Sequence, residues 1–250
     1  MERRAGAKAL ERARPAAPEA AKADEFSATE VLTEGFRTWL SQLPAYAGIT
    51  LLLHAPLLLV SFLPLPHIVV VPVFLAVEVA IAIVIKAALT KAVLDYQRTL
   101  ETDFSELIEA LRGAPSVLIL GARILGRALI KTFYLVAPGI KYLCEMFAAI
   151  PAYIAEGGSM ERAQQRSARL TDGVRIQVFS ICLVIWAVAA FWTFAFGVLD
   201  GGGMGSKAWI LFYLSARSLD RSWAAVLSAV NYHFLCARPD PAPAARAAPR

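Results

Sequence analysis

Six ionisable side chains interrupt long apolar stretches of this chain, and they are the residues whose types and spacing allow chemistry. They are His54, Glu78, Arg123, Arg127, Lys131 and Glu145. A charge inside a bilayer is expensive, so such residues pair with one another or line a path for an ion, a proton or a lipid headgroup. Arg123, Arg127 and Lys131 recur at every fourth position, which predicts that they share one face of a helix.

Depth along the expected helices predicts partners for these charges. Counted from the non-cytoplasmic turns, Glu78 and Arg127 lie at a similar depth, as do Lys131 and Glu145. His54 also falls near the middle of its apolar stretch. Two interpretations stay open. The pairs hold the helices in register, or they line a polar cavity in which an anionic headgroup balances the excess of basic residues.

The elements that must position these residues are apolar stretches long enough to cross a bilayer. About 20 helical residues, at ~1.5 Å each, span a hydrocarbon core of ~30 Å. The expected spans cover residues 46–63, 68–90, 116–136, 138–156, 175–199 and 208–236. The fold predicted for residues 26–236 is therefore an all-α, polytopic transmembrane helical bundle of about six membrane helices, with short amphipathic helices at the interface.

The two ends of the chain differ from this membrane domain. Residues 1–25 are poor in large apolar side chains and are predicted to form a disordered cytoplasmic tail. Residues 237–250, rich in Pro and Ala, are predicted to be flexible. Ser27 opens a capping box that begins a helix over 28–43. This helix either lies in the membrane interface with Trp39 at headgroup level, or packs on the bundle as a soluble elbow.

Turn and cap signals divide the remaining connections. Asp103 fits the start of a short amphipathic helix between the second and third spans. Pro138 and Gly139 are expected to turn the chain between the third and fourth spans. Ser159 is expected to cap a short helix that ends near Gly173.

The last span carries charge near its middle. Arg217 and Asp220 are three residues apart and are able to pair within a helix, with Arg221 beside them. If 208–236 is one span, these charges sit at mid-depth. The alternative is an interfacial piece followed by a short span that begins near Ser222.

Positive charge predicts the orientation. The turns at 64–67 and 137–140 contain no Lys or Arg, whereas both chain ends and the loops at 92–114 and 157–174 are basic. With six spans, every basic segment falls on one side, which predicts a multi-pass protein with both termini in the cytoplasm. Lys86 is expected to extend its long side chain to that cytoplasmic interface.

Composition and missing motifs exclude several classes of function. The chain is 58% hydrophobic, against about 45–50% in a soluble domain. The net charge of +5 is attributed to topology and lipid contact, and no nucleic-acid partner is expected. The sequence lacks phosphate-binding, zinc-protease and serine-hydrolase motifs. We therefore expect no enzymatic activity, no metal site and no cofactor.

One block of the chain, residues 137–179, resembles a known family. The residues that carry the resemblance are Pro138, Gly139, Pro151, Glu156, Arg166, Ser167 and Gly173. They are similar to a pattern in YciC-like bacterial inner-membrane proteins and in the membrane domain of glycerophosphoryl diester phosphodiesterases. The resemblance implies a six-helix domain of the bacterial inner membrane, without the catalytic barrel of the fused enzymes. The basic residues Arg123, Arg127 and Lys131 depart from that pattern.

These observations predict a non-enzymatic integral inner-membrane protein, either a scaffold or a lipid-interacting module. It is expected to self-associate or to join a membrane complex, with membrane lipids, including anionic headgroups, as partners. The alternative is a small transporter or channel with a polar intramembrane path near His54, Glu78 and Arg127.

Overall fold

The computed structural model describes residues 26–61, 67–99, 113–200 and 207–238, and within these ranges every regular element is an α-helix. The helices are α2 (Ala28–Ser41), α3 (Leu43–Ser61), α4 (His67–Thr99), α6 (Ala114–Tyr134), α7 (Val136–Glu145), α8 (Ala149–Glu156), α9 (Met160–Leu170), α10 (Arg175–Asp200) and α11 (Lys207–Ala237). The predicted all-α fold is confirmed for this part of the chain. The two predicted tails, apart from residues 237 and 238, and the amphipathic helix expected at Asp103 lie outside the described residues.

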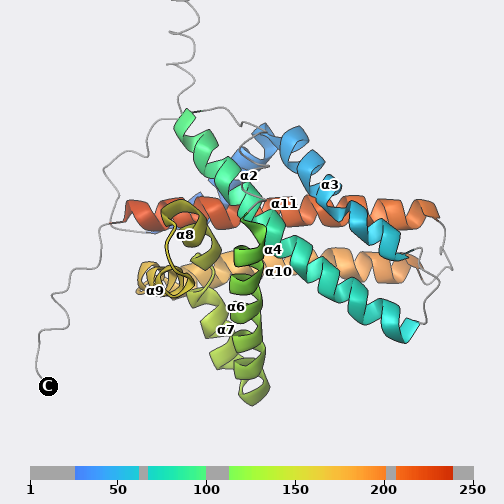
Figure 1. Cartoon of the computed structure of the whole chain (residues 1–250). Coiled ribbons are helices and arrows are strands. Elements are labelled where there is room, and N and C mark those ends of the chain that lie inside the picture. The colour runs from blue at the N-terminus through green and yellow to red at the C-terminus, as the bar shows by residue number, and fades with distance from the viewer. Residues whose placement is uncertain (1–25, 62–66, 100–112, 201–206, 239–250) are drawn as a thin grey trace, which may run out of the picture.

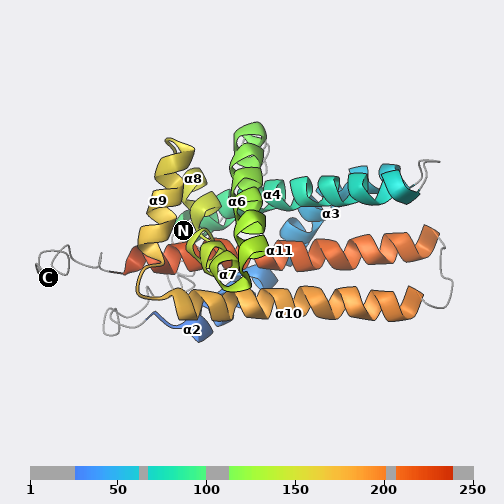
Figure 2. The same ribbon diagram turned by 90° about the horizontal axis from the view of Figure 1, so that it is seen from below.

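Two antiparallel pairs of long helices, α3 with α4 and α10 with α11, form the body of the molecule. The C-terminal ends of α3 and α10 and the N-terminal ends of α4 and α11 lie at the same end of the molecule, on the right in Figure 1. Helices α2, α8 and α9 gather toward the opposite end (Figure 2). Helix α11 is central, because it packs against α2, α3, α4, α8 and α10.

Two segments are long and apolar enough to cross a membrane. They are Pro72–Gln97 within α4 and Arg175–Ala195 within α10, while the apolar segment Leu43–Leu57 of α3 is shorter. Length and composition therefore support membrane association through these helices. The expected bundle of six spans is not confirmed, because the other predicted spans do not reach the same length and hydropathy within the described residues.

Helices α6 and α7 form a hairpin that lies across the long helices. In both Figure 1 and Figure 2 the hairpin is nearly perpendicular to α10 and α11. The segment 138–156 was expected to be one span, but it is two short helices, because α7 ends at Glu145 and α8 begins at Ala149. This crossing and this break do not fit a bundle of six similar spans.

The turn of the hairpin lies at Leu135, and the prediction that Pro138 and Gly139 form it is wrong. Leu135 has extended backbone angles, with φ −158° and ψ 134°, between α6 and α7. Pro138 lies in the first turn of α7, where backbone N–H groups have no intrahelical acceptor and a proline is tolerated. Gly139 faces Thr132 of α6 so closely that any Cβ at position 139 would collide with that side chain.

Helix α2 begins as predicted and packs against the bundle. The Ser27 hydroxyl accepts a hydrogen bond from the backbone N–H of Glu30, as an N-cap does. Trp39 donates its indole N–H to the hydroxyl oxygen of Ser222 on α11, at 2.8 Å. Trp39 is therefore held by a side chain of the bundle, and α2 packs against α11.

Helix α11 is continuous over its 31 residues. The alternative of an interfacial piece followed by a short span from Ser222 is therefore wrong. Ser222 lies within the helix and donates its hydroxyl to the carbonyl of Leu219. Consequently the charges of Arg217, Asp220 and Arg221 are carried on a single unbroken element.

Candidate functional site

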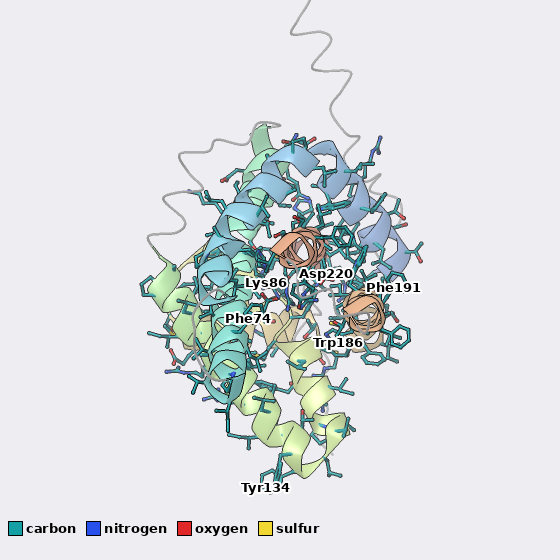
Figure 3. All side chains as sticks on the ribbon, turned by 90° about the vertical axis from the view of Figure 1, so that its right-hand side faces the viewer. Phe74, Lys86, Tyr134, Trp186, Phe191 and Asp220 are labelled. Carbon is teal, nitrogen blue, oxygen red and sulfur yellow. The ribbon has the colours of Figure 1, made fainter. Side chains whose placement is uncertain are left out.

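A cluster of ionisable side chains lies buried among α3, α4 and α11. The cluster consists of His54, Glu78, Arg217, Asp220 and Arg221, and every member except the half-buried Arg221 is buried. Glu78 is about 16 Å along α4 from its start, and Arg217 about 15 Å along α11 from its start. Because both starts lie at the same end of the molecule, the two residues meet. Figure 3 looks along α11 from that end and shows Asp220 inside the molecule.

Glu78 is the central acceptor of this cluster. Its Oε1 atom lies 3.4 Å from Nη2 of Arg217 and 3.1 Å from Nη2 of Arg221, and Nε of Arg221 donates to the same oxygen at 3.2 Å. Arg217 also contacts Oδ2 of Asp220 at 3.3 Å through Nη1, which confirms the predicted pairing of these two residues. Two carboxylates thus balance two guanidinium groups, so the cluster is neutral when His54 is neutral.

His54 contacts the other oxygen of Glu78. Its Nδ1 lies 2.7 Å from the carbonyl oxygen of Thr50 and 3.2 Å from the hydroxyl of Ser218. A carbonyl oxygen only accepts, so Nδ1 carries the hydrogen when the ring is neutral. The lone pair of Nε2 then faces Oε2 of Glu78 at 3.6 Å. Two acceptors that face each other in this way form a place for one proton.

Three atoms of the cluster have no hydrogen-bond partner among the described residues. They are Nε2 of His54, Nε of Arg217 and Oδ1 of Asp220, all of which are buried. An unpaired buried polar group costs free energy, and native proteins usually satisfy it with another protein group, water or a ligand. These atoms therefore mark the cluster as a place where a small polar species would be stabilised.

A groove of about 430 Å³ is lined in part by His54. It lies between α3 and α11, and its lining comprises Gly48, Leu51, Leu52, His54, Ala55, Leu214 and Ser215. The volume is within the range of small-ligand pockets. Its walls are mainly aliphatic, and Leu51 and Leu52 are exposed, so the groove joins an apolar surface to the buried cluster.

Arg123 and Arg127 do not belong to this cluster, and the predicted pairing of Glu78 with Arg127 is wrong. Arg123 donates to Oε1 of Glu161 at 2.6 Å, and Arg127 donates to Oε1 of Gln164 at 3.1 Å. Both acceptors are on α9. The two arginines do share a face of α6 as expected, and their hydrogen bonds show that this face meets α9. Helix α6 itself crosses the long helices (Figure 1).

The predicted pairing of Lys131 with Glu145 is also wrong. Lys131 places its ammonium group 4.2 Å from the ring centre of Tyr142, and Glu145 pairs with Arg175 at 3.3 Å. The reason is the position of the turn. Because the chain reverses at Leu135, residues near 140 lie opposite Lys131, whereas a turn at 138–139 would have brought Glu145 to it.

Lys86 extends inward between the helices (Figure 3). Its Nζ donates to the carbonyl oxygen of Phe147 at 3.0 Å and lies 4.6 Å from the centre of that ring. Phe147 sits at the break between α7 and α8, where carbonyl groups lose their helical donors. Ser228 of α11 donates to the same carbonyl at 3.2 Å. Sequence reasoning missed this role because it expected no break there.

The block at 137–179 shapes the turn between α8 and α9. Oε1 of Glu156 accepts from Nε of Arg166 at 2.9 Å and from the hydroxyl of Tyr232 on α11 at 2.8 Å. Ser167 donates to the carbonyl oxygen of Glu145 at 2.6 Å. Pro151 is buried in α8 and Gly173 has φ +78°, a conformation that favours glycine. These contacts are architectural and contain no nucleophile–base pair.

Neither a metal site nor a known relative is found for this chain among the described residues and the proteins compared. Within the described ranges, no three His, Cys, Asp or Glu side chains are grouped so that they could hold a metal ion. No family model matches the chain, and no curated protein or solved structure matches it either. The resemblance of residues 137–179 to the YciC-like proteins therefore stays a prediction.

Proposed function

We propose that this protein is an integral membrane transporter or channel whose solute site is the cluster of His54, Glu78, Arg217, Asp220 and Arg221. The observation that carries the proposal is the burial of two acid–arginine contacts about one third of the way along α4 and α11, with three unpaired polar atoms at the same place. Intramembrane ionisable groups of this kind commonly line solute pathways. The cluster contains His54 and Glu78 of the path expected from the sequence, and Arg217 and Arg221 replace Arg127.

In this proposal four helices, α3, α4, α10 and α11, cross the bilayer. The α6–α7 hairpin lies in the membrane interface. Gly121 of α6 contacts Ile83 of α4, about 24 Å along α4 from its start. This depth is close to the far edge of a hydrocarbon core of ~30 Å.

The faces of α6 support that position for the hairpin. Arg123 and Arg127 face the polar helix α9. Leu125, Leu129 and Phe133 are exposed, and their spacing places them on a face away from the arginines. A helix with one basic and one apolar face lies in the interface, with the apolar side toward the acyl chains.

The same placement agrees with the distribution of positive charge. The connections at 62–66 and 201–206 contain no Lys or Arg, whereas α9 and the last residues of α11 lie at the opposite, basic end. Cytoplasmic segments carry the excess of Lys and Arg. We therefore propose cytoplasmic termini, and the bacterial inner membrane is the location that the resemblance of residues 137–179 implies.

A flux screen in sealed proteoliposomes tests the proposed function. Vesicles are loaded with potassium, chloride or alanine, and release of each solute is measured for the wild type, Glu78→Gln and Glu145→Gln. Glu145→Gln is the matched control, because it removes the same charge from an ion pair outside the cluster. Release of one solute class that is lost in Glu78→Gln and kept in Glu145→Gln supports the proposal. Wild-type vesicles as tight as protein-free vesicles to all three solutes would contradict it.

A lipid-interacting module is a second candidate, favoured by the surface of the hairpin. Phe133 is 89% exposed, and Tyr134, Leu135 and Val136 next to it are also exposed, as is Lys131. Such a tip suits contact with acyl chains and anionic headgroups. Native mass spectrometry after gentle extraction is the test. Anionic lipid retained by the wild type and lost in Lys131→Gln supports this role, and a lipid-free monomer contradicts it.

A further inference from the structure

We infer that the buried cluster binds one small monovalent anion together with one proton, so that the two move as a pair. This inference rests on the proposed function and names its substrate class. It follows from the two different neighbours of Glu78. One carboxylate oxygen faces His54, and the other faces Arg217 and Arg221. A single residue therefore connects a proton site with an anion site.

The proton site lies between His54 and Glu78. The hydrogen bond from Nδ1 to the carbonyl of Thr50 fixes the ring so that Nε2 faces Oε2 of Glu78 at 3.6 Å. A proton that arrives on Nε2 makes an imidazolium–carboxylate pair, and a proton that moves on to Oε2 makes a neutral acid beside a neutral ring. Either state removes one unit of negative charge from the field that Arg217 and Arg221 experience.

The anion site lies on the two arginines. Oε1 of Glu78 now occupies three of their N–H groups, at 3.1 to 3.4 Å. Once Glu78 is neutralised, these donors lose their strongest acceptor, and an anion is able to take its place. The Arg221 side chain is 30% exposed, and the unpaired Nε of Arg217 provides a further donor.

Charge balance makes the two binding events dependent on each other. The empty cluster is neutral, since Glu78 and Asp220 offset Arg217 and Arg221 while His54 is uncharged. A proton alone leaves one excess positive charge, and a monovalent anion alone leaves one excess negative charge. An uncompensated charge at this depth is costly. The cluster returns to neutrality only when both are bound.

Other charged groups near these helices have partners of their own. On α4, Lys86 lies two turns from Glu78 and donates to the carbonyl of Phe147. The helix α6 also packs on α4, but its Arg123 and Arg127 contact α9. The described charges that contact Glu78 are therefore those of His54 from α3 and of the arginines from α11.

The experiment measures proton movement driven by an anion gradient. Wild-type protein is reconstituted in vesicles that contain a pH-sensitive dye, with the membrane potential clamped by potassium and valinomycin. An inward gradient of chloride, or of nitrate in a parallel experiment, is expected to acidify the lumen in step with anion uptake. Glu78→Gln, which cannot accept the proton, is expected to lower the anion-driven acidification about tenfold or more.

Two further variants keep the test decisive. His54→Gln removes the proton donor to Glu78 and is expected to reduce the acidification in the same way, should Glu78→Gln fail to fold. Glu145→Gln, outside the cluster, is expected to behave as the wild type. Acidification that persists in folded Glu78→Gln or His54→Gln would overturn the inference. Transport of potassium or alanine without anion movement would overturn it while leaving the proposed function intact. Vesicles tight to every solute would overturn both.

Discussion

Helices α11 and α6 each carry a pair of arginines at four-residue spacing, Arg217 with Arg221 on α11 and Arg123 with Arg127 on α6. On α11 both arginines contact the buried Glu78 of another helix. On α6 both are exposed and contact side chains of the polar helix α9. The spacing places each pair on one helical face, but the angle at which the helix crosses its neighbours decides whether that face meets a buried carboxylate or water.

The largest effect is expected in the buried cluster. Glu78→Gln leaves Arg217 and Arg221 without their shared carboxylate, and removing one partner of a buried ion pair costs about 3–5 kcal/mol. Thermal unfolding in mild detergent should therefore shift to clearly lower temperature.

A double-mutant cycle sharpens this prediction by naming the partner. Glu78→Gln combined with Arg217→Gln should lose much less stability than the sum of the single changes, because each removes the other's unpaired charge. Glu78→Gln with Arg127→Gln should be additive. If the stability losses at Glu78 and Arg217 simply added, Arg217 would not be the partner of Glu78. If those at Glu78 and Arg127 were coupled, the partner would lie on α6 instead of α11.

The next effect concerns the packing of the hairpin. Gly139→Ala would place a Cβ 2.9 Å from Cα of Thr132, so the two helices must separate, and overpacking of this kind costs about 1–3 kcal/mol. Gly126→Ala on the same hairpin is the control. It meets no atom within 4 Å, and the better helix propensity of Ala should keep or raise stability. Equal melting temperatures of the two variants would contradict the close contact of α6 with α7.

The membrane position of the hairpin is tested by a spin label with little expected effect on stability. A nitroxide at Phe133→Cys, with Cys236 replaced by Ser, should be more accessible to oxygen than to a water-soluble nickel complex. A label at Gln165→Cys on α9, also exposed, should show the opposite ratio. Preference of the label at position 133 for the nickel complex would place the tip in water and refute the interfacial position.

The smallest effect is expected on the exposed side of α6. A hydrogen bond from its own backbone N–H, followed by that from Arg123, lowers the pKa of Glu161 below its ordinary value of 4.5. A carboxyl with a lowered pKa stabilises the fold above its unfolded pKa and loses that contribution as the pH falls through the folded value. Arg123→Gln should therefore lower the melting temperature slightly at neutral pH, less than Gly139→Ala does. A difference from wild type that persists below the folded pKa would contradict this cause.

Local signals in the sequence predicted local structure well. The caps at Ser27 and Ser159 are formed as expected, because a cap depends on residues three positions apart. The Arg217–Asp220 contact was predicted for the same reason, because its two residues are also three positions apart.

Two of the predictions that failed depended on where the chain turns or breaks, and the pairing of Glu78 with Arg127 failed because α6 crosses the long helices. Placing the hairpin turn at Pro138 instead of Leu135 shifted the register of α7 against α6 and gave Lys131 the wrong partner. The break after Glu145 is marked only by Pro151 in the first turn of α8. Pro151 has no N–H to donate to the carbonyl of Phe147, and because this signal was not used, the role of Lys86 was missed. Counting residues from the helix start does work for α4 and α11, because both helices begin at the same end of the molecule. Such a count would have found Arg217 and Arg221 as partners of Glu78.

The unbroken course of α11 has a mechanical consequence. The same rod carries Arg217 in the buried cluster and Tyr232, whose hydroxyl holds Glu156 at the start of the α8–α9 turn. Fifteen residues of helix, about 22 Å, separate these two side chains. Because consecutive hydrogen bonds lock the rotation of every residue to that of its neighbours, α11 cannot swing Arg217 away from Glu78 without turning Tyr232 against Glu156. A rotation of α11 about its axis would therefore disturb the buried cluster and the contact of Tyr232 with Glu156 at the same time.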